Sequence, residues 1–312
     1  MIPTLLMAIF MFFMPETPSW LVSKNKNTEA EKSLQVLRGP DSDNEHELTL
    51  LTEQAKTSQQ GESFNLKLYL TREHGYPLLL ALGLMFFQQF SGINAVMFYS
   101  TNIFIEAGSS IQPKYATIIV GVAQVFATIA GSLLVDRLGR KLLLNISGSL
   151  HVLSTAALGL FYYCTAGQTE NSYGFVPVVS LVVFIIGFSV GFGPIPWLMV
   201  AEITPITSRS ATSAIATAFN WLGAFLITKN FELLKDAITK HGTFFLFSGI
   251  SLLSIVFVVV TLPETRGKST EEIAQFFADK PSGSSNEQSL LKNGNNQSTT
   301  SDRVELEKLN LA

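Results

Sequence analysis

The sequence predicts an all-α membrane protein whose main part is a bundle of six membrane-spanning helices. The first observation is composition: the 312 residues are 47% hydrophobic and only 14% charged, whereas a soluble chain carries about 25% charged residues. The second is that charge is absent from six long windows. Helices on the surface of a soluble protein would show a polar face at helical spacing, and these windows do not.

The six charge-free windows are long enough to cross a bilayer. Each has about 19 or more residues, and at 1.5 Å per residue such a helix spans a hydrocarbon core of about 30 Å. The windows are 77–101, 115–135, 142–163, 177–200, 210–228 and 244–262. Together they predict a six-transmembrane-helix bundle over residues 77–262.

A shorter apolar stretch, residues 1–14, precedes them. It lacks the basic leading region and the small-residue cleavage site of a signal peptide. We therefore interpret it as the end of a transmembrane helix whose beginning is absent.

The remaining segments are polar. In the loop 15–76, the capping-box pattern of Thr28 and Glu31 predicts a helix over 29–38 that stops at Gly39-Pro40. Further helices are predicted over 43–59 and 64–73. The tail 263–312 becomes rich in Ser, Asn, Gln and Gly from about residue 281. Such a composition cannot bury enough apolar surface to fold, so disorder is predicted there.

The basic residues predict the orientation. Seventeen of the 21 Lys and Arg lie in the loop 15–76, the turn 136–141, Arg209 and the tail. Under the positive-inside rule the loop and the tail are cytoplasmic, and six crossings return the chain to the same side. A net charge of −3 indicates no nucleic-acid partner, and a single cysteine excludes an intramolecular disulfide and a cysteine-cluster metal site. No cofactor or metal is indicated.

The tripeptide Pro-Glu-Thr occurs twice, at 15–17 and 263–265, each time directly after an apolar run. Six predicted helices separate the two copies. This spacing is expected if a six-helix bundle occurs twice in tandem, as in transporters built from parallel repeats. The chain would then hold the last helix of a first bundle and the whole second bundle, without the first five helices.

Side-chain amides inside the predicted spans indicate a neutral, hydroxyl-rich ligand such as a sugar. An amide both donates and accepts hydrogen bonds, as a hydroxyl requires, and an unpaired amide in a dry core costs a few kcal/mol. Gln88, Gln89 and Asn94 cluster around Gly92, where we expect the helix to break and present them. The other candidates are Gln124, Asn220 beside Trp221, and Trp197 after the Pro194-Ile195-Pro196 break.

Structural readings of the same residues stay open. An intramembrane amide also joins helices, a membrane Trp is often interfacial, and the two prolines form either a gate or a static kink. We interpret His151, a lone imidazole within a span, as a packing residue.

Five motifs in order resemble the sugar-porter branch of the major facilitator superfamily. They are QQFSGINAVMFYS (88–100), DRLGRK (136–141), GFGPIPWLMVAEI (191–203), FNW (219–221) and PETRGKS (263–269). The resemblance extends from residue 1 to about 277 and is strongest to facilitated trehalose and hexose transporters. It implies twelve helices in two halves and sugar transport by alternating access.

The resemblance also implies roles for single residues. Gln88, Gln89, Asn94 and Trp197 match sugar contacts, Phe188 an aromatic cavity position, and Tyr99 and Trp221 gating aromatics. This sequence departs from the pattern at three positions, which leaves room for a disaccharide. Gln124 and Ala224 stand where many relatives have Asn, and Ser189 stands where hexose-selective relatives have Glu.

Charged residues gather at the predicted cytoplasmic helix ends. They are Asp136, Arg137, Arg140 and Lys141, then Glu202 and Arg209, and finally Glu264 and Arg266. Either they form a solvated rim, in which single ion pairs are worth about 0–1 kcal/mol, or they latch helix ends in one transport state. The resemblance favours the latch.

Three functions are compatible with these observations. The chain is a fragment or short isoform of a facilitative sugar transporter in the plasma membrane, a sugar sensor, or a regulatory half-bundle that forms a homodimer or pairs with a full-length copy. The spans carry no nucleophile–base pair and no metal-ligand set, so an enzyme is disfavoured.

Overall fold

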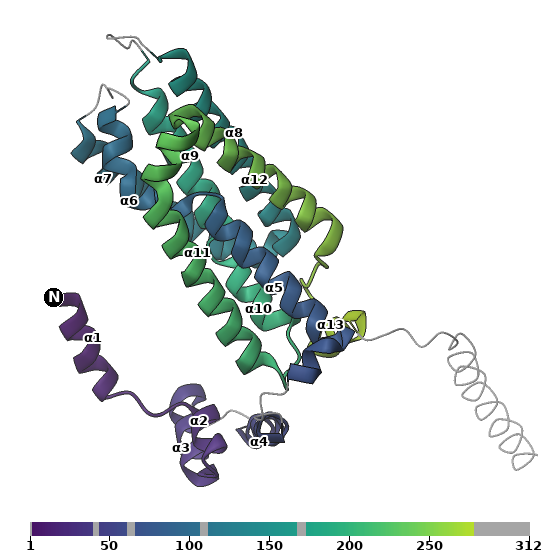
Figure 1. The fold of residues 1–312 in the computed structure, drawn as a ribbon. Coiled ribbons are helices and arrows are strands. Elements are labelled where there is room, and N and C mark those ends of the chain that lie inside the picture. The colour runs from purple at the N-terminus through teal and green to yellow at the C-terminus, as the bar shows by residue number, and fades with distance from the viewer. Residues whose placement is uncertain (1, 40–43, 61–65, 107–111, 167–172, 278–312) are drawn as a thin grey trace, which may run out of the picture. The chain divides into compact units, whose positions relative to one another are not determined.

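The protein is helical throughout the part of the chain that the structure describes. The computed structural model describes residues 2–39, 44–60, 66–106, 112–166 and 173–277, and within these ranges it contains no strand (Figure 1). The elements are α1 (Ile2–Phe12), α2 (Pro18–Ser23), α3 (Asn27–Arg38), α4 (Asn44–Gln60), the 3₁₀ helix η1 (Leu66–Leu70), α5 (Arg72–Phe90), α6 (Ile93–Glu106), α7 (Pro113–Leu138), α8 (Arg140–Cys164), α9 (Val176–Val190), α10 (Ile195–Ile203), α11 (Arg209–Ile238), α12 (Lys240–Thr261) and α13 (Thr270–Phe277).

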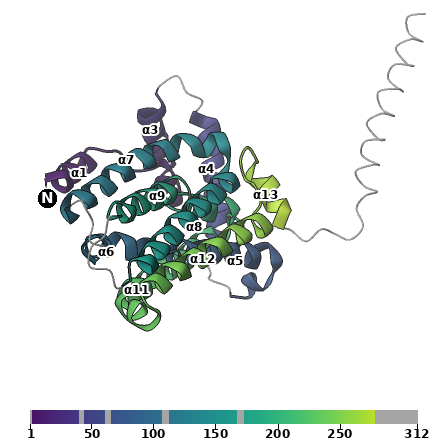
Figure 2. The ribbon, with the colours of Figure 1, turned by 90° about the horizontal axis from the view of Figure 1, so that it is seen from above.

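Six helical segments in the described residues are long and apolar enough to cross a membrane, which confirms the predicted bundle. Four are the single helices α7, α8, α11 and α12, and two are broken pairs, α5–α6 and α9–α10. Their lengths of 22 to 35 residues exceed the minimum for about 30 Å of hydrocarbon. Helix α8 packs along α12 and α9, α9 along α7, and α11 along α5, and Figure 2 shows these helices from above.

Among the described residues, the interior of the bundle has two large apolar clusters toward its two ends and a smaller one around Met85 and Val200. One large cluster contains Phe104, Phe184 and Phe244 and joins α6 to α9 and α12. The other contains Leu84 and Met199 and joins α5 to α10 and α13. The half-buried Phe188 packs against both large clusters. The level between the clusters is where the helices α5–α6 and α9–α10 break.

The first break lies at Ser91-Gly92, between α5 and α6. Gly92 has φ +96°, a left-handed conformation that a residue with a Cβ atom adopts only with strain. The ring of Phe247 lies against it, since a Cβ atom here would approach Phe247 Cδ2 to 2.7 Å. The expectation that the helix breaks at Gly92 therefore agrees with the structure.

The second break lies at residues 191–194, between α9 and α10. Pro194 and Pro196 have no N–H to donate, so the chain cannot continue α9 without a gap in its hydrogen bonds. The backbone N–H of Phe192 instead donates to Ser147 Oγ on α8 at 3.1 Å. Irregular backbone at this depth is tolerated because its polar groups find partners inside the protein.

Helices α2, α3 and α4 form a small cluster of their own, in which Leu21, Val22 and Ala30 are buried against half-buried residues of α4. The predicted helices over 29–38 and 43–59 correspond to α3 and α4. The capping box expected at Thr28 is wrong, because α3 begins at Asn27 and its N-cap residue is Lys26. Helix α2 was not predicted, although a proline at the first helical position, here Pro18, is typical of a helix start. The helix expected over 64–73 is wrong: its described residues form the shorter η1, and α5 begins at Arg72, five residues before the predicted span.

Helix α13 is a second element that the sequence analysis missed. Its start is a capping box, in which the backbone N–H of Ser269 donates to Glu272 Oε2 at 3.0 Å and that of Glu272 donates to Ser269 Oγ at 3.2 Å. Ile273 and Phe277 are buried, and Phe277 lies 5.8 Å from the ring of Tyr76 on α5. The disorder predicted from about residue 281 concerns residues outside the described part of the chain.

Helix α7 approaches α9 closely at Gly131, which yields a test of the packing. A Cβ atom at Gly131 would meet Ser189 O at 2.9 Å and Val190 Cα at 3.0 Å, both backbone atoms, whereas a Cβ atom at Gly121 on the same helix meets nothing within 4 Å. Gly131→Ala should lower the free energy of unfolding by about 1–3 kcal/mol through overpacking. Gly121→Ala should leave it unchanged or raise it by about 0.5–1 kcal/mol, because alanine favours the helix. Thermal unfolding of both purified variants checks this, and equal effects would contradict the close approach.

Candidate substrate-binding cavity

A cavity of about 430 Å³ opens at the level of the two helix breaks, within the size range of small-molecule sites. It is lined by Gln88, Gln89, Ile93, Asn94, Met97, Gln124, Thr128, Phe188, Ser189, Gly193, Pro194, Trp197, Asn220 and Trp221. None of these side chains is ionisable in the physiological range. The lining therefore suits a neutral ligand.

The structure brings the predicted binding residues together. All seven, namely Gln88, Gln89, Asn94, Gln124, Phe188, Trp197 and Asn220, line this one cavity, although six different helices supply them. Of the predicted gating residues, Pro194 and Trp221 also line it, whereas Tyr99 and Pro196 do not. Ile93, Met97 and Thr128 were not predicted, because apolar side chains and a threonine carry no distinctive signal within a span.

Four amide side chains form a continuous hydrogen-bonded network. Asn94 Nδ2 donates to Gln89 Oε1, and Gln89 Nε2 donates to Asn220 Oδ1 at 2.9 Å. Asn220 Nδ2 donates to Gln88 Oε1 at 2.6 Å. Gln88 Nε2 then donates to the backbone carbonyls of Phe192 and Gly193, at 2.7 and 3.0 Å. The network thus connects the break in α5–α6 with the break in α9–α10 through α11.

The amide side chains that line the cavity differ in how many of their hydrogen-bonding groups are free to bind a ligand. Gln88 is 2% exposed and uses both donor hydrogens and its oxygen inside the protein. The half-buried amide of Gln124 has no hydrogen bond to the described residues, and neither has Asn94 Oδ1. Gln124 therefore has a free amide and Asn94 a free amide oxygen. Gln88 instead holds the backbone of Phe192 and Gly193 at the second break.

Aromatic faces complete the lining. Trp197 follows directly on Pro196 at the start of α10 and is 40% exposed, and Phe188 approaches from the end of α9. A tryptophan face covers the apolar C–H surface of a ring compound while amides bind its polar rim. This combination fits a polyhydroxylated ring.

The remaining predicted residues lie outside the cavity. Tyr99 fastens α6 to α11, because its hydroxyl donates to Thr228 O at 3.2 Å and its ring lies 4.9 Å from that of Phe231. Pro196 is buried in the first turn of α10. His151 is 1% exposed and stacks on Phe184 at 4.4 Å, in agreement with a packing role.

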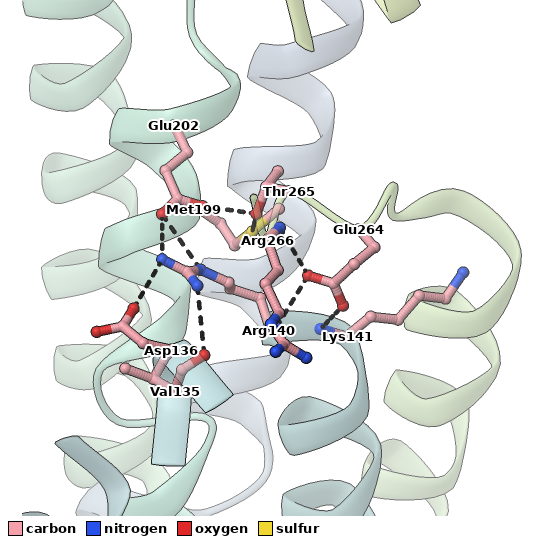
Figure 3. A network of polar contacts seen from close by, with 9 residues as sticks. All are labelled: Val135, Asp136, Arg140, Lys141, Met199, Glu202, Glu264, Thr265 and Arg266. Atoms are coloured by element: carbon pink, nitrogen blue, oxygen red, sulfur yellow. Dashed lines mark hydrogen bonds and ion pairs between the residues drawn. The ribbon is translucent and has the colours of Figure 1, made fainter. Parts of the chain in front are cut away.

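At one end of the bundle, six of the eight predicted charged residues lie together around Arg140, all except Arg137 and Arg209 (Figure 3). The Arg140 guanidinium donates to Glu202 Oε1 from Nε and Nη2, at 3.2 and 2.9 Å. Asp136 lies 3.4 Å from Nη2, but its side chain is 79% exposed, so this pair contributes little. Glu202 Oε2 accepts a hydrogen bond from Thr265 Oγ1 at 2.6 Å. The network therefore links α8, α10 and the segment after α12.

Glu264 binds the start of α8. Its carboxylate accepts hydrogen bonds from the backbone N–H groups of Arg140 and Lys141, each at 3.0 Å, and from that of Arg266 at 3.0 Å (Figure 3). Burial alone would raise the pKa of Glu264, but these N–H groups outweigh it and hold the pKa below its ordinary value. The carboxylate thus satisfies N–H groups that the first turn of a helix leaves free.

Gly139 allows this close approach. It has φ +89°, and a Cβ atom there would meet Glu264 Oε2 at 2.8 Å.

The other members of the predicted latch have different roles. Lys141 Nζ donates to Val259 O and Leu262 O at the end of α12, at 2.9 and 3.0 Å. Arg209 Nη2 donates to Thr204 O at 3.3 Å. Arg266 takes part through its backbone, and the exposed Arg137 makes no ion pair or hydrogen bond with the described residues. Thr265 was not predicted, although it belongs to the repeated Pro-Glu-Thr.

A second ionic cluster lies at the far end of α6 and was not predicted. Glu106 accepts from Lys235 at 3.0 Å and from Lys240 at 2.8 Å, and Glu232 pairs with Lys235 at 2.8 Å. The spacing of Glu232 and Lys235 on one helix was a local signal, but the pairing with Glu106 depends on the fold. The cluster ties α6 to α11 and α12.

The chain matches the family described as "Sugar (and other) transporter" over residues 1–277. It belongs to this family of membrane transporters. It is 47% identical over 267 residues to the facilitated trehalose transporter Tret1-2 homolog of Drosophila simulans, a match that covers 85% of this chain and 55% of that relative. The facilitated trehalose transporter Tret1 of Apis mellifera ligustica is 45% identical, and 86% of this chain and 54% of that relative are covered. The chain thus spans about half the length of these relatives.

Solved structures of sugar porters share the fold. The proton:xylose symporter XylE bound to 6-bromo-6-deoxy-D-glucose superimposes with a TM-score of 0.72 at 26% identity, over 89% of this chain and 57% of that one. The inward open conformation of XylE from E. coli gives a TM-score of 0.61 at 27% identity, over 89% and 55%. These likenesses confirm a major-facilitator-type bundle.

The lowered pKa of Glu264 predicts a pH dependence of stability. A carboxylate whose pKa is lower in the folded chain stabilises the fold above its unfolded pKa of about 4.3, and this contribution is lost as the pH falls through the lower folded pKa. Glu264→Gln should therefore destabilise the protein by about 1–2 kcal/mol at pH 7. The difference from the parent should shrink when the pH falls well below 4.

Chemical unfolding at several pH values measures this difference. Asp136→Asn, which removes a neighbouring but exposed carboxylate, is the matched control and should change stability little. A loss for Glu264→Gln that does not depend on pH would argue against the role of its charge.

Proposed function

We propose that this chain provides the sugar-binding bundle of a facilitative transporter that works by alternating access. The uncharged cavity carries this proposal, because its amides and Trp197 offer paired donors and acceptors beside an aromatic face. Membership of the sugar-transporter family supports it.

The substrate we propose is trehalose or a hexose. Relatives at 45–47% identity are named trehalose transporters, and XylE binds a bromodeoxyglucose in a related fold. Ser189, a small residue, lines the cavity, and Ala224 on α11 is small as well. Small side chains at these positions leave more room for a disaccharide than Glu or Asn would.

We propose that residues 15–76 and the tail face the cytoplasm of a plasma-membrane protein, because most Lys and Arg lie there. The Arg140 network then closes the cytoplasmic ends of the helices. The higher TM-score to the sugar-analogue complex than to the inward open form, 0.72 against 0.61, supports the view that this conformation is not inward open. Breaking the network would accompany opening toward the cytoplasm.

We propose further that the bundle works together with a second six-helix bundle across the cavity. Alternating access requires two bundles that rock about a site at their interface, and the described residues contain one. A homodimer or a pairing with a longer copy would supply the second bundle where the same polypeptide does not.

The substrate class can be tested by equilibrium binding. The purified 312-residue chain, in detergent or in lipid nanodiscs, should bind radiolabelled trehalose or glucose, and unlabelled sugar should displace it. Organic anions and cations should not compete, because no ionisable side chain lines the cavity. Binding that organic ions displace and sugars do not would disprove the proposal.

A pair of glutamine variants separates ligand contact from scaffold. Gln124→Leu should weaken sugar binding by about 1–3 kcal/mol while thermal stability is retained, because this amide has no partner in the described protein. Gln88→Leu should lower both sugar affinity and stability, since it leaves the carbonyls of Phe192 and Gly193 without their donor. Titration calorimetry and thermal unfolding of both variants provide the two readouts. A loss of stability in Gln124→Leu equal to that in Gln88→Leu would refute the distinction.

A further inference from the structure

A second, smaller cavity lies beside the Arg140 network and takes no part in the sugar site. Its volume is about 290 Å³, and Arg140, Glu202, Arg209 and Lys268 supply its charged groups. It shares no residue with the larger cavity. It lies where the starts of α8 and α11, the end of α10 and the turn before α13 meet.

The charge of this cavity is strongly positive for its size. Three cationic side chains and one carboxylate line it, which leaves a formal charge of +2. The carboxylate of Glu202 is already engaged by Arg140 at 2.9 Å and by Thr265 at 2.6 Å. Arg209 and Lys268 therefore contribute positive charge that Glu202 does not neutralise.

Arg209 holds an unused donor. Its Nε atom is buried and has no hydrogen-bond partner in the described part of the chain, while Nη2 donates to Thr204 O at 3.3 Å. A buried donor to which no acceptor is supplied loses its hydration without compensation. This loss is offset when a ligand supplies the acceptor.

Lys268 brings a second free cation to the same place. The turn at Gly267, with φ +71°, carries the chain past Thr265, and Lys268 N donates to Thr265 O at 3.1 Å. The exposed ammonium group of Lys268 makes no ion pair with the described residues. Lys268 lines the cavity together with Thr265 and Gly267 of the same turn.

We propose that this cavity binds a phosphate group, as inorganic phosphate or as a phosphomonoester. A phosphomonoester carries about −1.5 to −2 charges at pH 7, which matches the surplus of the lining. The planar fork of a guanidinium suits two phosphate oxygens, and a lysine adds a point charge. A single carboxylate would leave about one positive charge uncompensated.

Bound phosphate stabilises the conformation described here. The side chains that bind it come from α8, α11 and the turn before α13, so the site is complete only while these segments stay together. A ligand that prefers one conformation shifts the population toward it. Phosphate is thus a regulator that holds this end of the bundle closed.

The test is equilibrium binding of radiolabelled inorganic phosphate to the purified 312-residue chain in a phosphate-free, non-ionic detergent. Binding should be saturable, and phosphate should raise the melting temperature. Lys268→Gln and Arg209→Gln should each weaken binding about tenfold or more. Lys268 lies on an exposed turn, so its variant remains informative even where Arg209→Gln impairs folding.

Two matched controls separate a built site from general surface charge. Arg137→Gln removes an equal charge from the same end of the bundle but lies outside the cavity, and it should change affinity less than about twofold. Gln124→Leu, which alters the sugar cavity, should bind phosphate like the parent. Non-saturable binding, or an equal loss in Arg137→Gln and Lys268→Gln, would overturn the proposal.

Competition identifies the source of the phosphate group. Vesicles of phosphatidylcholine with 20% phosphatidic acid, a phosphomonoester lipid, are compared with vesicles of phosphatidylcholine alone. If only the vesicles that contain phosphatidic acid displace labelled phosphate, the site is assigned to a lipid headgroup. Displacement by soluble phosphomonoesters but by neither vesicle assigns it to a soluble ligand, and both results support the site.

Discussion

The fold depends on one constraint, which is that every backbone polar group inside the membrane needs a partner within the protein. Two of the six spans break, at Gly92 and at residues 191–194, and each break frees backbone groups. Gln88 lies just before the break at Gly92, and its side chain donates hydrogen bonds to two backbone carbonyls of the break at residues 191–194. Removing one partner of such a buried pair costs about 1–3 kcal/mol. This amide thus connects the two breaks at whose level the cavity lies.

The same constraint explains the charged end of the bundle. The first turn of α8 leaves N–H groups free and the last turn of α12 leaves carbonyls free. Glu264 accepts from the former, and Lys141 donates to the latter. Both residues therefore cap a helix to which they do not belong: Glu264 caps the start of α8, and Lys141 caps the end of α12. This is why the second Pro-Glu-Thr directly follows the last span.

The sequence predicted those features that depend on local physics. Charge-free windows located the six spans to within about five residues at each end, except that α11 continues ten residues beyond its window, to Ile238. Gly92 and the prolines located the breaks, because each acts on its own backbone. The amides of the cavity were recognisable because a polar side chain within a span requires a partner. Which partner each amide selects was beyond prediction, and so was the division between Gln88 as scaffold and Gln124 as a free group.

Long-range pairings and short helices were harder. Glu264 caps a helix that starts 124 residues earlier, and Glu106 pairs with Lys235 at a separation of 129 residues, so no local pattern contained either contact. Helix α13 had a local signal in Ser269 and Glu272, but its eight residues gain stability only from Phe277 and Ile273 packing on the bundle.

The distribution of polar groups along the bundle also bears on how the proposed transport cycle proceeds. The centre is held by buried neutral amides, whose loss leaves unpaired groups in an apolar interior. The ends are held by ion pairs near water, such as Arg140–Glu202 and Lys240–Glu106. Lys240 is 46% exposed, and an exposed charge regains solvation when its pair separates, so breaking such a surface pair costs only about 0–1 kcal/mol. The Arg140–Glu202 pair, whose side chains are 14% and 25% exposed, costs more to break. Motion about a fixed centre, with the two ends opening in turn, is therefore the movement that this arrangement of contacts opposes least.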